Sequence, residues 1–259
     1  MKKLSLLISL IFILIGQTQS QVLISLLLGD DLNSDKLEFG LEGGGNFSKI
    51  GNLGNNKFLP DWNIGFYFDI TIKENKPWNF YTGVLVKSRL GATNLSEYDI
   101  LNLSDKAIYK ETGTYSQKIK TFIIPVFLKY KFNRHFYVEA GPQLGLMYKA
   151  WIEYEYETSD TYKLEKYYNT DNFNKIDYGF AAGTGYRFKG RTGWTVGIKY
   201  YYGLADAIKI LDNSNNQSLF LKVNIPIGRS EAAQKRRLEK QKAREAKKLQ
   251  KKNKKLNNN

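Results

Sequence analysis

An alternation of apolar and polar side chains over Trp62–Lys73 constrains the fold of this chain more than any other feature. The even positions carry Trp, Ile or Phe, whereas the odd positions are polar or glycine and include Asp69 and Lys73. Successive side chains of a β-strand point to opposite faces, so this segment would form a strand with one apolar and one charged face. The fold must therefore give the two faces different surroundings.

Seven further segments repeat this alternation, which predicts eight strands in all. They lie at residues 37–48, 80–90, 119–132, 136–156, 176–189, 194–204 and 218–227. Each is about as long as a strand that crosses a bilayer, roughly 9–11 residues or more. We therefore expect an all-β fold, an eight-stranded antiparallel up-and-down transmembrane barrel.

The connections between these segments alternate in length. Three are short, at residues 74–79, 133–135 and 190–191, and four are long, at residues 49–61, 91–118, 157–175 and 205–217. In an up-and-down meander, alternate connections lie at opposite ends, so tight turns gather at one end and long loops at the other. Outer-membrane barrels have this asymmetry, with the tight turns in the periplasm. The fifth segment stays alternating but becomes polar at residues 152–157, which predicts a strand that projects above the membrane.

The two faces differ in bulk as well as polarity, and this decides which one points inward. An eight-stranded barrel has an interior only just wide enough for side chains. The apolar set is rich in Trp, Phe and Tyr, whereas the polar set combines glycine with charges of both signs, which could pair in a confined lumen. The expected lumen charge network is Glu38, Glu42, Asp69, Lys87, Arg89, Lys129, Glu139, Lys149, Asp177, Arg187, Lys199 and Lys222. The expected lipid-facing residues are Trp62, Phe66, Phe68, Phe122, Phe180, Trp194 and Tyr200, and Trp62, Trp78, Tyr130, Tyr137, Tyr148 and Trp194 fit aromatic girdles.

The ends of the chain differ from the part between them. Residues 1–20 have the basic start, apolar run and small residues of a signal peptide, and residues 21–36 would be a periplasmic lead-in segment. The barrel would then occupy residues 37–228, and residues 229–259 a basic, helical or disordered tail. Of the net charge of +14, the tail contributes +10, from 13 Lys and Arg against 3 Glu.

An even number of strands places both ends in the periplasm, where the tail would meet acidic envelope partners such as peptidoglycan or an acidic protein. A charged, solubilising extension without a partner is the alternative, and the signal peptide argues against nucleic acid. The tail residues that would make such contacts are Lys235, Arg236, Arg237, Lys240, Lys242, Arg244, Lys247 and Lys248.

Three segments resemble the PorT-like outer-membrane β-barrel proteins. They are Lys36–Ser48 (KLEFGLEGGGNFS), Phe122–Tyr130 (FIIPVFLKY) and Phe136–Gly145 (FYVEAGPQLG). The resemblance extends over about residues 21–228 and implies a small barrel in the bacterial outer membrane. It also implies a possible link to protein secretion. The basic tail departs from the family pattern, because it leaves the last strand away from the end of the chain.

The sequence offers no recognisable catalytic site, cofactor site or metal site. The chain has no cysteine, and its one histidine, His135, falls in a predicted short turn, far from the cleft that a catalytic base requires. We therefore expect a non-enzymatic outer-membrane protein with a structural or interaction role, in protein secretion or cell-envelope anchoring. A narrow channel for water or small ions is one alternative, and a soluble ligand-binding barrel with an apolar interior is another.

Overall fold

The computed structural model describes most of the barrel region of the chain. The described residues are 36–53, 57–73, 76–104, 110, 112–158, 161–188 and 193–227, with the isolated helical positions 239 and 242. The chain divides into two compact units, Phe39–Ile225 and a unit formed by the two chain ends, Met1–Glu38 and Pro226–Asn259. The expected signal peptide, the lead-in segment before Lys36 and nearly all of the tail lie outside the described residues.

Nine strands and one short α-helix make up the regular structure of the described residues. The strands are β1 (Leu37–Ile50), β2 (Leu59–Thr71), β3 (Trp78–Thr93), β4 (Thr114–Lys131), β5 (Phe136–Thr158), β6 (Thr161–Tyr168), β7 (Ile176–Arg187), β8 (Thr195–Asp206) and β9 (Asn215–Pro226). The helix α2 (Glu97–Leu103) lies between β3 and β4, and a 3-10 turn, η2 (Thr170–Asn172), lies between β6 and β7. No helix in the described part of the chain is long and apolar enough to cross a bilayer.

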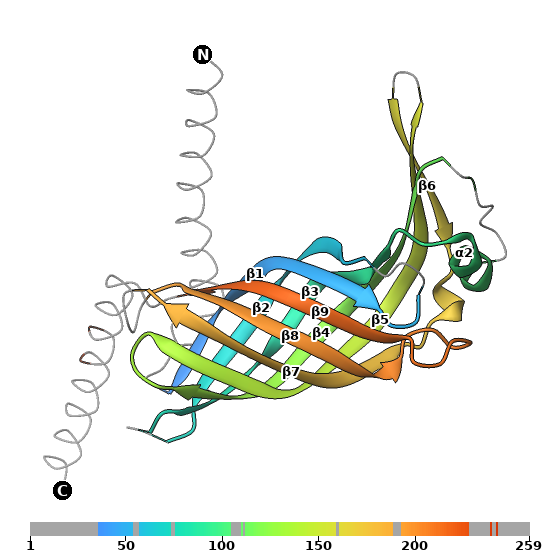
Figure 1. Cartoon of the computed structure of the whole chain (residues 1–259). Coiled ribbons are helices and arrows are strands. Elements are labelled where there is room, and N and C mark those ends of the chain that lie inside the picture. Colours follow the sequence, from blue (N-terminus) through green and yellow to red (C-terminus); the bar gives the residue numbers. More distant parts are fainter. Residues whose placement is uncertain are drawn as a thin grey trace, which may run out of the picture. The chain divides into compact units, whose positions relative to one another are not determined.

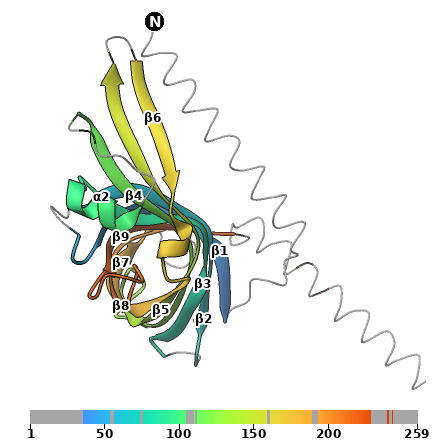
Figure 2. The ribbon, with the colours of Figure 1, turned by 90° about the vertical axis from the view of Figure 1, so that its right-hand side faces the viewer.

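Eight of the strands close into a barrel. The sheet order is β4-β3-β2-β1-β9-β8-β7-β5-β6, and an additional antiparallel pairing of β4 with β5 joins the ends of the ring (Figure 1). Figure 2 is a view along the barrel. The ninth strand, β6, pairs with β5 and is not part of the ring. The prediction of an all-β antiparallel barrel is thereby confirmed, and all eight predicted strands occur within a few residues of their expected bounds.

β6 and α2 were not predicted, because both lie inside segments expected to be long loops. β5 runs 23 residues, past the barrel, and its last part pairs with β6 from Trp151↔Tyr168 to Thr158↔Thr161. α2 begins at a capping box, in which the Ser96 side chain accepts from the Asp99 amide and Asp99 accepts from the Ser96 amide. Such a box satisfies two of the free N–H groups at a helix start. The long connections therefore carry structure of their own.

Register shifts interrupt several of the described strand pairs, and two of them change the face of residues expected in the lumen. In the β2–β3 pair, Ile64 lies opposite Lys87 but Gly65 lies opposite Leu85, so Val86 is an extra residue. In the β4–β5 pair, Lys120 lies opposite Lys149 but Thr121 lies opposite Met147, so Tyr148 is extra. An extra residue moves the side chains beyond it to the other face of the strand.

The close approach of β1 to β9 at Gly44 requires glycine. Gly44 has φ +154°, and a Cβ built on it would lie 1.9 Å from the Leu221 carbonyl oxygen. Its neighbour Gly43 has room, since a Cβ there would lie 3.4 Å from the Asn63 carbonyl oxygen. The two glycines are adjacent in sequence but not equivalent in the wall.

We predict that Gly44→Ala lowers the free energy of unfolding by about 1–3 kcal/mol, because the strand must shift to relieve the overlap. Gly43→Ala is the matched control, and it should change stability by less than about 0.5 kcal/mol. Urea unfolding of the refolded protein in detergent micelles measures both. Equal effects of the two substitutions would contradict the placement of β1 against β9.

Candidate functional site: lumen, cap and hairpin

The side chains that fill the lumen form a connected network of charges. Lys129 Nζ lies 3.1 Å from Asp69 Oδ2 and 3.4 Å from Glu139 Oε2, so one ammonium joins two carboxylates. Asp69 also accepts from Lys131, at 3.2 Å, and from the Asn79 amide, at 2.5 Å. Glu139 is paired a second time, with Lys222. The buried charges thus occur in alternating signs, as a confined polar interior requires.

Aromatic rings inside the barrel support this network, and the sequence analysis did not foresee them. Tyr81 lies at the centre: its hydroxyl bonds Glu42, it accepts from the Asn224 amide at 2.7 Å, and its ring lies 4.0 Å from Lys129 Nζ. A cation over an aromatic face is attracted by the ring quadrupole, most strongly where water is excluded. The lumen cluster of buried residues is Tyr67, Tyr81, Leu85, Leu90, Ile123, Phe127, Ala181, Tyr201 and Phe220.

Most of the charged residues expected in the lumen are buried. Lys199 lies over the Phe220 ring, at 4.5 Å, and Asp177 accepts from the Asn216 amide at 3.1 Å. Arg89 is only partly buried and its Nε lies 3.0 Å from Asp61 Oδ1. The buried members are Glu38, Glu42, Asp69, Lys129, Glu139, Asp177, Arg187, Lys199 and Lys222.

Three expectations about the faces of the wall are wrong. Lys87 and Lys149 are exposed on the outer face, with their Nζ atoms 4.4 Å from the Trp62 ring and 4.3 Å from the Tyr168 ring. Each lies directly after the extra residue of a β-bulge, which reverses the direction of its side chain. Tyr137, expected in an aromatic girdle, is instead buried in the lumen beneath Lys129, at 4.4 Å.

The bulky apolar residues lie on the outer face of the barrel. Phe180 is 62% exposed and Trp194 49% exposed, and each is flanked by buried neighbours in the sequence. Phe66 and Phe68 are half-buried because Phe39 packs beside them, with ring centroids 5.9 and 5.1 Å apart. The outer-face set is Trp62, Phe66, Phe68, Phe122, Phe180, Trp194 and Tyr200. A soluble ligand-binding barrel requires the reverse arrangement, so that alternative is wrong.

A second apolar cluster lies at the end of the barrel with the long connections, and we call it the cap. α2 contributes Ile100 and Leu103, and the Asn169 and Asn172 side chains donate to the Leu103 carbonyl at 3.0 and 2.8 Å. Tyr115 and Tyr154 stack at 4.3 Å. The cap is Ile50, Leu53, Ala92, Leu95, Ile100, Leu103, Tyr115, Ile119, Met147, Ala150, Ile152, Tyr154, Phe173, Ala207 and Ile208.

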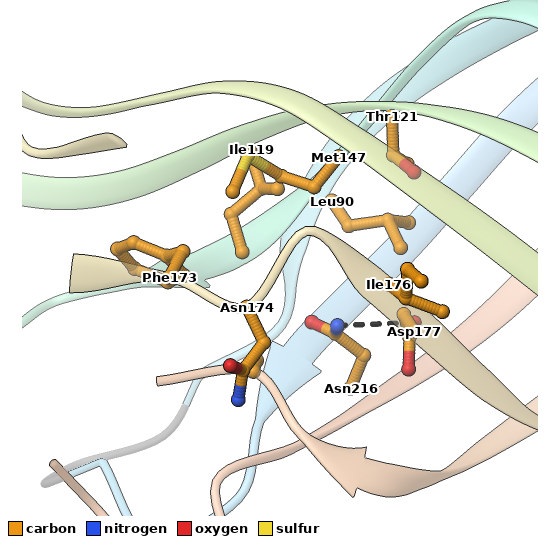
Figure 3. A pocket seen from close by; sticks show the side chains of 10 residues that line it. Leu90, Ile119, Thr121, Met147, Phe173, Asn174, Ile176, Asp177 and Asn216 are labelled. Carbon is orange, nitrogen blue, oxygen red and sulfur yellow. Dashed lines mark hydrogen bonds between the residues drawn. The ribbon is translucent and has the colours of Figure 1, made fainter. Parts of the chain in front are cut away.

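A small cavity lies between the cap and the lumen network. It has room for about one water molecule. Figure 3 shows Met147, Ile119 and Leu90 on one side of it, and the hydrogen-bonded Asp177 and Asn216 on the other. The space is too small for an organic ligand, since such ligands occupy pockets of about 300–1,000 Å³.

The part of β5 beyond the barrel, together with β6, forms a hairpin that is fixed to β4 by a polar cluster. The Glu153 carboxylate lies 2.6 Å from Lys118 Nζ of β4, 3.6 Å from Lys166 Nζ of β6, and 3.1 Å from the Trp151 indole nitrogen, which donates to it. Burial alone would raise the pKa of Glu153, but these hydrogen bonds and lysine charges hold the pKa below its usual value. The hairpin is therefore attached through three strands.

On the other face of the hairpin, Glu165 bonds the hydroxyls of Tyr156, at 3.0 Å, and Tyr167. The hydrogen bond to Glu165 raises the pKa of Tyr167 to about 12. The Tyr156 contact joins β6 to β5, whereas the Tyr167 contact lies within β6.

Candidate catalytic groups do not converge at any of these places. His135 lies in the turn between β4 and β5, where its Nδ1 lies 2.8 Å from the Arg187 carbonyl oxygen and its ring stacks on Tyr186. Within the described ranges, no group of three or more His, Cys, Asp or Glu residues could hold a metal ion. What the geometry provides is a filled interior and an ordered surface at the long-connection end.

We predict that Lys129→Met lowers the free energy of unfolding by about 3–5 kcal/mol, because Asp69 and Glu139 remain buried with fewer partners. Lys87→Met removes an equally long charged side chain from the outer face, and it should cost about 1 kcal/mol or less. The urea midpoint of the refolded barrel compares the two variants. A loss at Lys87 as large as that at Lys129 would contradict the described network.

Comparison with known proteins gives a family and several distant structures. The family model of the outer membrane protein beta-barrel domain matches residues 17–209. No curated protein matches the sequence. The chain is similar to the attachment invasion locus protein Ail of Yersinia pestis, solved with the heparin analogue sucrose octasulfate (14% identity, 73% of this chain, 97% of that chain, TM-score 0.37).

Two further solved structures show similarity at the same level. Neisserial surface protein A has 12% identity over 72% of this chain and 96% of its own, with TM-score 0.34. OprG of Pseudomonas aeruginosa has 11% identity over 74% of this chain and 93% of its own, with TM-score 0.35. Because the family model matches most of the chain, over strands β1 to β8, this protein belongs to the outer membrane protein beta-barrel domain family and lies in the bilayer of the bacterial outer membrane.

Proposed function

We propose that this protein is a non-enzymatic outer-membrane barrel that is closed to solutes and presents the cap and the β5–β6 hairpin as an interaction surface. The carrying observation is that side chains occupy the lumen at successive levels. Paired charges around Asp69, Lys129 and Glu139 interleave with the lumen cluster around Tyr81, and the cap lies beyond them toward the long connections. An open pore needs a continuous polar path, and the apolar cap interrupts one.

The orientation of the barrel in the membrane is part of the proposal. Outer-membrane barrels have short turns in the periplasm and longer loops outside. Here the connections at 72–77, 132–135 and 188–194 are short, whereas those at the opposite end carry α2, β6 and η2. We infer that the cap and hairpin are external and that both ends of the chain are periplasmic.

The absence of enzymatic activity is likewise proposed from the use of the carboxylates. Asp69 and Glu139 are each held by two lysines, and Glu42 is held by Tyr81. A general acid or base must be able to exchange its proton with a substrate. Carboxylates that are paired and enclosed in this way stabilise the barrel instead.

Two finer roles rest on sequence features. The PorT-like segments support an association with protein secretion, and the basic tail supports anchoring to peptidoglycan or to an acidic envelope protein. Of the tail residues named above, only Lys242 is described, as an exposed helical position. Co-sedimentation of the full chain with cell wall at low salt and its release at high salt would support anchoring. Retention of a chain that lacks residues 229–259 would contradict it.

Conductance in planar bilayers tests the closed lumen against the narrow channel. We predict that the wild-type protein shows no unitary ion conductance. A variant with Tyr81→Ala and Phe127→Ala in the lumen cluster, combined with Ile119→Ala and Phe173→Ala in the cap, should leak ions, because it opens both apolar layers. Phe180→Ala, on the outer face, is the control that should stay silent. A defined unitary conductance of the wild-type barrel would overturn the closed-lumen proposal and favour the channel.

A further inference from the structure

β6 has a free edge. In the described part of the chain, β6 is the last strand of the sheet, and β5 is the one strand that pairs with it. Its side chains are exposed along most of its length: Tyr162 is 81% exposed and Leu164 49% exposed. An exposed strand edge presents unpaired N–H and C=O groups and is a template for a further strand. β6 is eight residues long and exposed, so a second strand could add to this edge.

The orientation of the hairpin determines which occupant the edge can take. Figures 1 and 2 both show β5 and β6 running across the direction of the barrel, away from its side. In Figure 2, which looks along the ring, the two hairpin strands are seen side by side and face-on. The hairpin is twisted, and near its tip one face of it is turned toward a viewer who looks along the ring. Two antiparallel strands from identical chains are related by a two-fold axis perpendicular to their sheet, which here runs along the barrel.

This direction is the one that a membrane requires. Two copies embedded in one bilayer with the same orientation are related by a two-fold axis along the membrane normal, and the closed dimer is the commonest symmetric assembly. Addition of β6 of one copy to β6 of another satisfies the condition without tilting either barrel. If the hairpin sheet lay parallel to the barrel, the two-fold axis would lie in the membrane plane, and the two copies would have opposite orientations.

The sequence of β6 then selects one register. Opposed residues must point to the same face, so a two-fold axis has to pass through a residue and not between two residues. Registers centred on Lys163, Glu165 or Lys166 place two like charges against each other on the axis, which is unfavourable. The register centred on Leu164 places leucine on leucine.

The remaining pairs of the Leu164 register are complementary as well. On one face, Lys163 of each copy lies opposite Glu165 of the other. On the opposite face, Tyr162 lies opposite Lys166, a cation beside an aromatic ring. Thr161 and Tyr167 complete the register, so all seven residues 161–167 of each strand are paired.

We propose that this protein forms a dimer in the outer membrane by antiparallel pairing of β6 with β6 of a second copy, about a two-fold axis through Leu164. The inference rests on the proposed role of the hairpin as an interaction surface and names its partner. One seven-residue strand is a small contact, below the area of a stable soluble interface. Confinement of both copies to one bilayer, in one orientation, raises their effective concentration and offsets this deficit.

Single-cysteine cross-linking tests the register directly, because the chain has no cysteine of its own. In the proposed pairing the two Leu164 Cα atoms are about 4.5–5.5 Å apart, within the range of a disulfide. Leu164→Cys should therefore give a disulfide-linked dimer when outer membranes are oxidised mildly and run on a non-reducing gel. Lys166→Cys is the control: it lies about 13 Å from its counterpart and should stay monomeric, whereas Tyr162→Cys with Lys166→Cys in one chain should link.

A charge-exchange experiment tests the Lys163–Glu165 pairs without altering the overall charge of the mixed pair. In the Leu164→Cys background, Lys163→Glu places glutamates opposite each other in both pairs, and Glu165→Lys places lysines there. Each variant alone should form about tenfold less cross-linked dimer. Co-expressed with different affinity tags, the two variants should recover a mixed dimer, because each glutamate then faces a lysine.

The outcomes separate this inference from the proposed function. A folded Leu164→Cys barrel, recognised by its heat-modifiable mobility, that stays monomeric or links to a different envelope protein would overturn the β6 dimer. Equal linking of Leu164→Cys and Lys166→Cys, or an undiminished dimer from the Lys163→Glu variant alone, would overturn it too. Conductance is measured on the same samples: a silent monomeric barrel leaves the closed-lumen proposal standing, whereas a conducting dimer overturns that proposal alone.

Discussion

The pairing of Lys129 with both Asp69 and Glu139 is the interaction on which the rest of the barrel depends. An eight-stranded wall leaves an interior that side chains must fill, and here about half of every strand is polar. Charges so enclosed are tolerable only when each has an opposite charge or a hydrogen bond. With these charges paired inside, bulky residues such as Trp62, Phe180 and Trp194 are left for the outer face, where they contact the bilayer.

The alternation of the sequence was sufficient to predict the strands, their antiparallel order and the unequal ends of the barrel. It failed where the period of two is interrupted. The extra residues Val86 and Tyr148 turn Lys87 and Lys149 outward. A bulge depends on how two strands pair, so the sequence of one strand alone does not predict it. The lumen rings were missed because Tyr81 and Tyr137 are amphipathic and fit either face.

The two elements that were not predicted, α2 and β6, differ in the signal that the sequence gives for them. Ser96 and Asp99 form the recognisable spacing of a capping box, which is a signal for α2 that the sequence contains. β6 offers no such signal, because its residues are exposed on both faces and hence do not alternate between apolar and polar. Such a strand forms because it pairs with its neighbour. The long polar continuation of β5 was therefore the one sequence feature that indicated β6. The elements outside the barrel wall are thus harder to predict from the sequence than the strands of the wall.

β5 passes without a break from the turn at Phe136 to the hairpin tip at Thr158, so one backbone is both wall and projection. A mobile loop has to lose conformational freedom when it docks, and that ordering weakens the complex. The projection here is already held by the Glu153 cluster and by the ladder of the barrel beneath it. A force applied to the hairpin tip is consequently transmitted along the backbone of β5 to the barrel strands inside the bilayer.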